Sequence, residues 1–126
     1  DYKAAVKWYT LAAEQGLAGA QYNLARMYAN GEGVPQDYKA AVKWYTLAAE
    51  QGDTDAQYNL ALMYANGEGV IQDNVYAHMW FNIAGSNGYE GAAAARATVA
   101  NRLTAADLSK AQDLARDCVR KEYKGC

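Results

Sequence analysis

The residues that could do chemistry are few in this 126-residue chain. Nucleophilic catalysis needs a nucleophile, a base and an orienting group within reach of one another. The chain has one histidine, His78, and two serines, Ser86 and Ser109, and neither serine begins an S-x-x-K motif. We therefore predict that the chain is not an enzyme and has no catalytic residue. The segment around His78 occurs twice earlier in the chain, and both earlier copies have valine at this position. We therefore interpret His78 as a surface residue or a boundary residue with satisfied hydrogen bonds.

Metal ligands and paired carboxylates are equally sparse. No C-x-x-C or H-x-x-x-H spacing is present, and a site built from His78 and the two cysteines would need the chain to fold back on itself. Glu14 and Glu50 recur, as do Glu32 and Glu68, because the segments around them recur. Each lies at an expected helix end or turn, so we interpret these acids as solvated. The sequence predicts neither a metal site nor a cofactor.

The two cysteines, Cys118 and Cys126, lie eight residues apart. A continuous helix would hold them about 12 Å apart along its axis, which is too far for a disulfide. Gly125 can end that helix after Tyr123 or Lys124 and let Cys126 turn back toward Cys118. A disulfide requires an oxidising compartment, which predicts a periplasmic or secreted location. The alternative is two free thiols, with Cys118 buried, in a cytoplasmic protein.

A long internal repeat determines which elements must position these residues. The block DYKAAVKWYTLAAEQG occurs at Asp1–Gly16 and again at Asp37–Gly52, and residues 1–36 and 37–72 are identical at 31 of 36 positions. Self-similarity at a fixed period of about 20–50 residues is the signature of a solenoid, in which each unit buries its apolar face against its neighbours. A solenoid offers an extended binding surface rather than one catalytic pocket.

Each segment between glycines is predicted to be a helix. In the second copy, Asp37 is placed to cap the helix N-terminus, and Gly52 ends the helix where a left-handed conformation is tolerated. Between them the apolar residues form one stripe at helical spacing: Ala41, Trp44, Tyr45, Ala48 and Ala49. The turn Asn66–Val70 follows a second helix with a matching stripe of Ala56, Leu60, Met63 and Tyr64. No segment alternates with period two, so we predict an all-α fold of antiparallel helical hairpins.

A third copy of the block begins at Asp73 and fades after Gly88. Thr104 then caps a more polar final helix, predicted to run to about Tyr123. A degenerate unit followed by a polar helix can close the last apolar face of a solenoid. The repeated tryptophans lie on the apolar stripe, so we interpret them as core residues rather than as an aromatic cage for a cation. They are Trp8, Trp44 and Trp80.

Composition limits the kinds of partner. A net charge of −2 provides no basic field that would draw nucleic acid. No run of about 18 apolar residues is present, so we predict no membrane insertion. The chain opens partway through a repeat unit and lacks an initiator Met, as a cleaved leader, an isolated domain or a fragment would produce. Its first helix then has no preceding neighbour, which leaves that helix free to pair with another chain.

These residues resemble Sel1-like repeats, a subclass of the tetratricopeptide-like helical hairpins. The family's unit has the form A-x-x-x-L-(G/A)-x-(M/L)-Y-x-x-G-x-G-V, followed by A-x-x-W-(Y/F)-x-x-A-A-x-x-G. Residues 20–34 match its first half and residues 41–52 its second, and residues 56–70 and 77–88 match it again. The resemblance implies a right-handed α-α superhelix with a C-terminal capping helix. It also implies a scaffold or adaptor role in protein–protein interaction, with no universal catalytic residue.

The resemblance to Sel1-like repeats predicts a single α-solenoid domain, 1–126. This domain begins with the second helix of an incomplete unit at 1–16. Repeat units follow at 17–52 and 53–88, and residues 89–126 form a degenerate unit and C-terminal cap. Exported cysteine-rich bacterial proteins that resemble this chain have been associated with penicillin binding or β-lactam hydrolysis, which is the alternative function. A consensus-like array with no ligand of its own is a further possibility.

In the resembled fold, the first helix of each hairpin lines the concave surface. Six residues on these helices would then face a common groove: Tyr22, Asn23, Arg26, Tyr58, Asn59 and Leu62. Tyr and Arg are enriched at binding hot spots, and Asn can pair with the backbone of an extended peptide. We therefore predict that these residues bind a protein or peptide segment. The alternative is that the tyrosines pack between helices and the asparagines hold each hairpin together.

Overall fold

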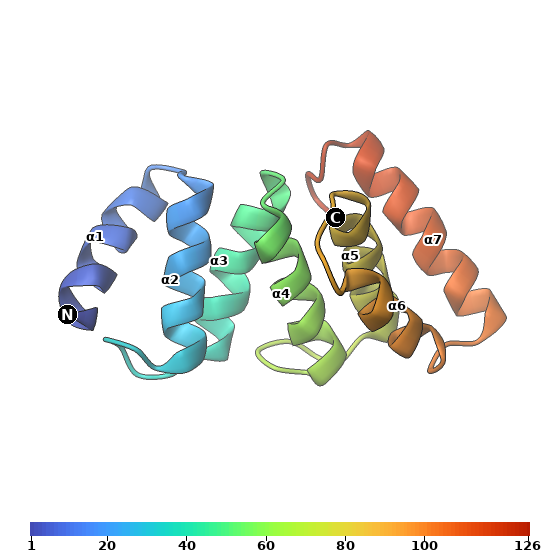
Figure 1. Cartoon of the computed structure of the whole chain (residues 1–126), viewed down its shortest axis with the longest axis horizontal. Coiled ribbons are helices and arrows are strands. Elements are labelled where there is room, and N and C mark those ends of the chain that lie inside the picture. Colours follow the sequence, from blue (N-terminus) through green and yellow to red (C-terminus); the bar gives the residue numbers. More distant parts are fainter.

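The computed structural model describes residues 1–126 and contains seven helices and no strand. The helices are α1 (Tyr2–Glu14), α2 (Ala18–Asn30), α3 (Tyr38–Glu50), α4 (Thr54–Asn66), α5 (Asn74–Ser86), α6 (Ala92–Ala100) and α7 (Ala105–Arg120). Figure 1 shows an elongated array with α1 at one end and α7 at the other. Each helix from α1 to α5 packs on the next, and α7 packs back on α5. The predicted all-α solenoid of helical hairpins is confirmed.

Side chains determine where most helices begin. Asp37 and Thr104 accept hydrogen bonds of 3.1 Å from backbone amides in the first turns of α3 and α7, which confirms both predicted caps. Asp53 caps α4 in the same way at 2.9 Å. Leu17, the equivalent residue before α2, has no side-chain acceptor, so α2 begins without a side-chain cap.

Two glycines shape the turn between α4 and α5. Gly67 ends α4 with a φ of 68°, in the left-handed region that glycine adopts without strain. Gly69 also has a positive φ, and a Cβ there would collide with the backbone carbonyl of Tyr38 at the start of α3. Gly33 meets Tyr2 of α1 in the same way. The α4–α5 loop therefore packs on the first turn of α3, and the α2–α3 loop packs on the first turn of α1.

Burial increases along the array from α1 to α5. Trp8 is 67% exposed, Trp44 is partly buried and Trp80 is 2% exposed. The predicted core position is therefore confirmed for Trp80 and wrong for Trp8. The reason is that α1 packs mainly on α2, whereas α5 is surrounded by α4, α6 and α7. The main core cluster accordingly centres on α3, α4 and α5.

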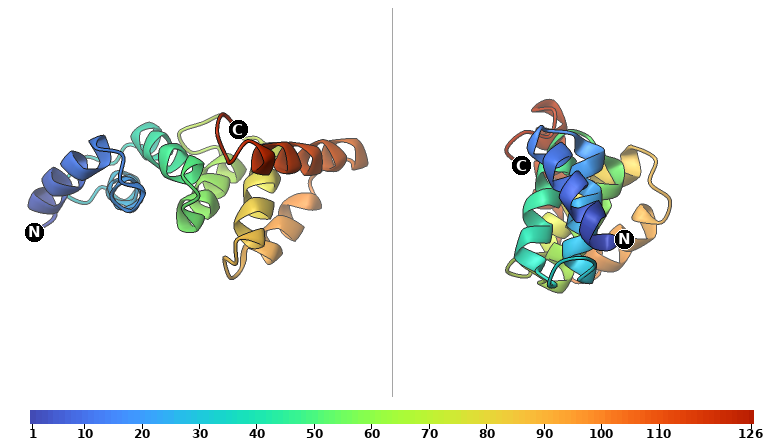
Figure 2. Two further views of the ribbon diagram at one scale, coloured as in Figure 1. Left: turned by 90° about the horizontal axis from the view of Figure 1, so that it is seen from above. Right: turned by 90° about the vertical axis from the view of Figure 1, so that its left-hand side faces the viewer.

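The last helix is shorter than predicted and is followed by a closed loop. Figure 2 shows α7 lying across α5. α7 ends at Arg120 rather than near Tyr123, because Glu122 and Tyr123 both take positive φ values. This reversal brings Cys126 back to Cys118, and the two form a disulfide with Cα atoms 5.5 Å apart.

The residues inside the disulfide loop contact the repeats. The backbone N–H of Gly125 donates to Oε2 of Glu50 at 3.0 Å. The side-chain amide of Asn87 donates to the Tyr123 hydroxyl at 3.2 Å. The C-terminal loop is therefore attached to the ends of both α3 and α5.

Candidate interaction groove

An open groove of about 260 Å³ lies between α2 and α4, with side chains of α3 along it. Three of the six predicted binding residues line it, and they come from successive repeats: Arg26 of α2 and Asn59 and Leu62 of α4. Tyr38 and Glu68 also line the groove and were missed, because their pairing joins one repeat to the next. A hydrogen bond with the Glu68 carboxylate raises the pKa of Tyr38. The groove therefore carries a cationic and an anionic side chain.

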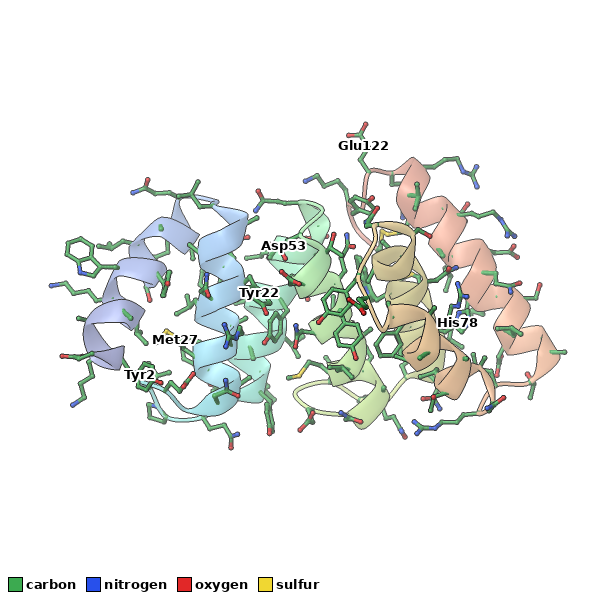
Figure 3. All side chains as sticks on the ribbon, viewed as in Figure 1. Tyr2, Tyr22, Met27, Asp53, His78 and Glu122 are labelled. Carbon is green, nitrogen blue, oxygen red and sulfur yellow. A yellow bond between two sulfur atoms is a disulfide. The ribbon has the colours of Figure 1, made fainter.

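Tyr22 lies beside this groove. Figure 3 shows its ring extending from α2 toward α4. The ring packs on Tyr45 of α3 with centroids 6.0 Å apart, and the guanidinium of Arg26 lies 5.8 Å from the Tyr22 centroid. Burial raises the pKa of Tyr22, Arg26 partly offsets that rise, and Asp55 of α4 and its N-cap residue Asp53 add to it. The phenol therefore stays neutral and available for hydrogen bonding.

Tyr58 is the equivalent residue of α4, and its ring is covered on one face. It packs on Phe81 of α5 at 5.3 Å between centroids, and it stacks on Tyr89 at 4.2 Å with the ring planes 15° apart. Tyr89 stands at the repeat position of Leu17 and Asp53, so the periodicity gave no sign of this stack. Tyr58 consequently offers less of its ring to a partner than a free tyrosine would.

The two predicted asparagines make hydrogen bonds within their own helices. Asn23 donates to the carbonyl oxygen of Gly19, and Asn59 donates to that of Asp55, both at 2.8 Å. Neither bond crosses to the other helix of the hairpin, so these side chains do not hold the hairpins together as the alternative expected. Their side-chain oxygens remain available as acceptors.

His78 lies on α5, away from this groove, and is buried. Its side chain is 3% exposed and its Nδ1 has no hydrogen-bond partner, so the predicted surface or satisfied boundary residue is wrong. The reason is that α5 is covered by α6 and α7, whereas Val6 and Val42 stay partly exposed in their helices. Burial lowers the pKa of His78, and Arg96 lowers it further.

Two kinds of feature are absent from residues 1–126. No group of three or more His, Cys, Asp or Glu side chains converges as metal ligands do. No helix combines the length and apolar character needed to cross a bilayer. Stacked helical hairpins define a helical-repeat protein.

Within that class, the chain belongs to the Sel1 repeat family. The Sel1 repeat pattern matches residues 1–17, 18–53 and 54–89. Sel1 repeat proteins are generally protein-interaction scaffolds and are typically non-catalytic.

Three solved structures share the fold. A protective antigen of uropathogenic Escherichia coli, c5321, which displays an SLR fold, matches 96% of this chain with a TM-score of 0.91 and 34% identity. A Sel1 repeat protein from Oxalobacter formigenes matches 75% of it with a TM-score of 0.72 and 36% identity. Cysteine rich protein B of Helicobacter pylori matches 71% of it with a TM-score of 0.67 and 26% identity.

This chain spans 27%, 39% and 67% of those three chains, in the same order. A comparison with curated protein sequences gives no match.

Proposed function

We propose that the chain is a non-enzymatic scaffold that binds an extended segment of another protein between α2 and α4. The observation that carries this proposal is that Arg26 of one repeat meets Asn59 and Leu62 of the next along one open groove. The other proposed contacts are Tyr22, Asn23 and Tyr58, on the same two helices. Rigid helices hold these side chains in place before binding, which reduces the ordering cost of association.

The side chains of the groove define the kind of segment that fits. Arg26 is exposed and lies beside the Tyr22 ring, so its guanidinium can pair with a carboxylate. Leu62 supplies an apolar contact, and the free oxygen of Asn59 can accept a peptide N–H. We expect an extended segment with an acidic residue at Arg26 and an apolar residue at Leu62.

Selection from a random peptide library, followed by affinity measurement, tests this groove. The variant Arg26→Leu gives the first repeat the residue that the second repeat has at position 62, so the fold should be retained. We expect it to weaken the selected acidic peptides at least about tenfold, because a hydrogen bond to a charged group contributes about 1.5 kcal/mol or more.

The matched control is Lys43→Gln, which removes a cation of α3 that lies 4.8 Å from the Trp44 ring rather than in the groove. This control should bind the same peptides unchanged. Binding that survives Arg26→Leu, or that Lys43→Gln weakens equally, would show that the segment binds elsewhere.

Penicillin binding or β-lactam hydrolysis remains the alternative function. Ser86 and His78 lie eight residues apart on α5, which places them about 12 Å apart along the helix axis. Ser86 therefore lacks His78 as a general base. We expect no turnover of nitrocefin, and measurable turnover would overturn the scaffold proposal.

We also propose a periplasmic or secreted location, which the Cys118–Cys126 disulfide supports because such bonds persist in oxidising compartments. Protein isolated from its native source and denatured without reductant should show no free thiol. Two free thiols would instead indicate a cytoplasmic protein.

The free face of α1 supports a proposal of self-association, with a second copy of this chain as the occupant. Ala41 and Tyr45 are buried in α3, which packs on α2. The equivalent residues of α1, Ala5 and Tyr9, are only partly buried. The face that α3 presents to α2 is therefore open on α1 and available to the α1 helix of a second copy.

A further inference from the structure

A second cavity lies among α5, α6 and α7, in the C-terminal part of the molecule. It is an open pocket of about 620 Å³, and its polar lining consists of His78, Asn82, Arg96, Gln112 and Arg116. Figure 3 shows His78 where these three helices meet. Two guanidinium groups, an imidazole and two amides line the cavity, and no carboxylate does. Such a lining favours an anion.

His78 is the residue that the repeat does not explain. The two earlier copies have Val6 and Val42 at this position, and valine would fill the same space without a polar atom. The His78 side chain is 3% exposed, lines the cavity and has an Nδ1 atom without a hydrogen-bond partner. Buried polar atoms nearly always have a partner, so the unpartnered Nδ1 marks His78 as a residue that packing alone does not explain.

The two arginines reach the cavity from different helices. Arg96 of α6 donates from Nη1 to Oδ1 of Asn82 at 2.9 Å, which fixes the guanidinium and leaves other N–H donors unused. Arg116 of α7 pairs with Asp113, and that aspartate does not line the cavity. The planar fork of N–H donors on each guanidinium matches the geometry of a carboxylate.

The charge of the chain is distributed in a way that favours an anion here. Residues 89–126 contain seven Lys or Arg and five Asp or Glu, a net charge of +2. Residues 1–88 contain five and nine, a net charge of −4. An anionic ligand is therefore attracted to the C-terminal part of the array and repelled by the repeats.

A smaller pocket adjoins the cavity and is partly apolar. It is an open pocket of about 360 Å³ and shares Asn82 and Arg116 with the larger one. Ile83, Ala115 and Val119 supply its apolar walls. A ligand whose anionic group lies near Arg116 can therefore extend an apolar group between α5 and α7.

We propose that these two pockets bind a carboxylate with an apolar tail, the carboxylate against Arg96 and Arg116 and the tail along Ile83 and Val119. A peptide C-terminus with an apolar last residue and a free aliphatic acid both have this chemistry. The site is separate from the groove between α2 and α4, so either proposal can fail without the other.

His78 is the only histidine of the chain, so its ring signals in an NMR spectrum report on the cavity directly. Titration with N-acetyl-leucine should shift these signals in a saturable way. N-acetyl-leucinamide, which lacks the charge, should not shift them. Acetate and inorganic phosphate, which lack the tail, should bind at least about tenfold more weakly, a difference that corresponds to about 1.4 kcal/mol.

Two further probes distinguish the source of the carboxylate. A pentapeptide ending in leucine that binds about tenfold more tightly than hexanoate would identify a peptide C-terminus as the ligand. Hexanoate binding as tightly as the peptide would identify a free aliphatic acid.

Variants connect the signal to the cavity, with binding followed through the methyl signals of N-acetyl-leucine. Arg116→Gln, at an exposed position of α7, should weaken binding at least about fivefold, the loss expected for one charge-assisted contact. His78→Val, which restores the residue of the earlier repeats, should also weaken it. Arg102→Gln removes a cation that does not line the cavity and should leave binding unchanged. Equal binding of the amide and the acid, or equal losses from Arg116→Gln and Arg102→Gln, would overturn the proposal.

Discussion

Arg26 and Leu62 occupy the same position in successive repeats and line the same groove. Because the backbone around them repeats, the difference between the two side chains becomes a difference between two places along one surface. The cation lies beside Tyr22, while the leucine supplies an apolar contact on the next helix. Two nearly identical units thereby present a surface whose chemistry changes along its length, which an exact duplicate would lack.

His78 is another repeat position at which the residue differs from that of the earlier copies, and this one is buried. Its burial leads to a prediction about how stability depends on pH. Burial, and to a smaller extent Arg96, lower the pKa of His78 below its ordinary value of 6.5. As the pH falls below 6.5, the unfolded chain binds this proton before the folded chain does, so the free energy of unfolding decreases. We therefore expect His78→Val to raise the melting temperature by more at about pH 5 than at about pH 8.

Thermal melts of both proteins over this pH range measure the effect. Arg102→Gln is the control, because it changes the charge of the same region without touching the buried ring. A gain from His78→Val that is the same at both pH values would contradict a lowered pKa.

Among the elements, the loop that joins α4 to α5 carries a specific packing requirement. We expect Gly69→Ala to destabilise the protein by more than about 2 kcal/mol, since it adds left-handed strain of about 1–2 kcal/mol and a collision with the Tyr38 carbonyl. Urea unfolding of the variant and the parent gives this difference.

Gly88→Ala is the matched control for that prediction. Gly88 has a φ of 93°, and a Cβ there would meet nothing within 4 Å, so only the backbone strain applies. A loss of about 1 kcal/mol is expected from strain alone. If both alanines cost the same, the contact between the loop and α3 contributes nothing to stability.

At the scale of the whole molecule, the disulfide is expected to stabilise the C-terminal end. Closing a loop of this length contributes about 2.5 kcal/mol by restricting the unfolded chain. The double variant Cys118→Ala/Cys126→Ala should lose that amount in urea unfolding. Its amides near Glu50 and Asn87 should also exchange hydrogen faster, because Gly125 and Tyr123 are no longer held there.

Reduced parent protein is the reference for this comparison, since it lacks the bond but keeps both side chains. It should match the double variant within about 1 kcal/mol, the usual scale of a buried side-chain change. A double variant as stable as the oxidised parent would show that the bond does not restrain the unfolded chain.

Self-association is the second prediction at this scale. We expect the isolated chain to dimerise with increasing concentration in sedimentation experiments, and Tyr9→Lys to prevent it by placing a charge on the open face of α1. Leu11→Lys is the control, because Leu11 and its equivalent Leu47 are both exposed and lie outside that face. A parent chain that stays monomeric at all concentrations would rule out the proposed pairing.

The structure shows which features the sequence could reveal. Asp37 caps its own helix and Gly52 ends it, so their roles depend on the local sequence and could be predicted. The exposure of Trp8 and the burial of His78 depend on how many helices surround α1 and α5, which a local pattern does not encode. In the groove, Arg26 and Leu62 were found because their difference is visible against the repeat. The stack of Tyr89 on Tyr58 joins the repeats to the cap, and no period marks it.

The contact between Gly125 and Glu50 has a consequence for how such a protein can change in length. Glu14 is the counterpart of Glu50 in the preceding copy of the block, and any further copy of residues 37–72 brings its own glutamate to the same place. Whole units can therefore be gained or lost by duplication or deletion in the gene while the terminal loop keeps its docking point. The length of the repeat array and the number of grooves can vary, while the hydrogen bond between the terminal loop and a glutamate is kept.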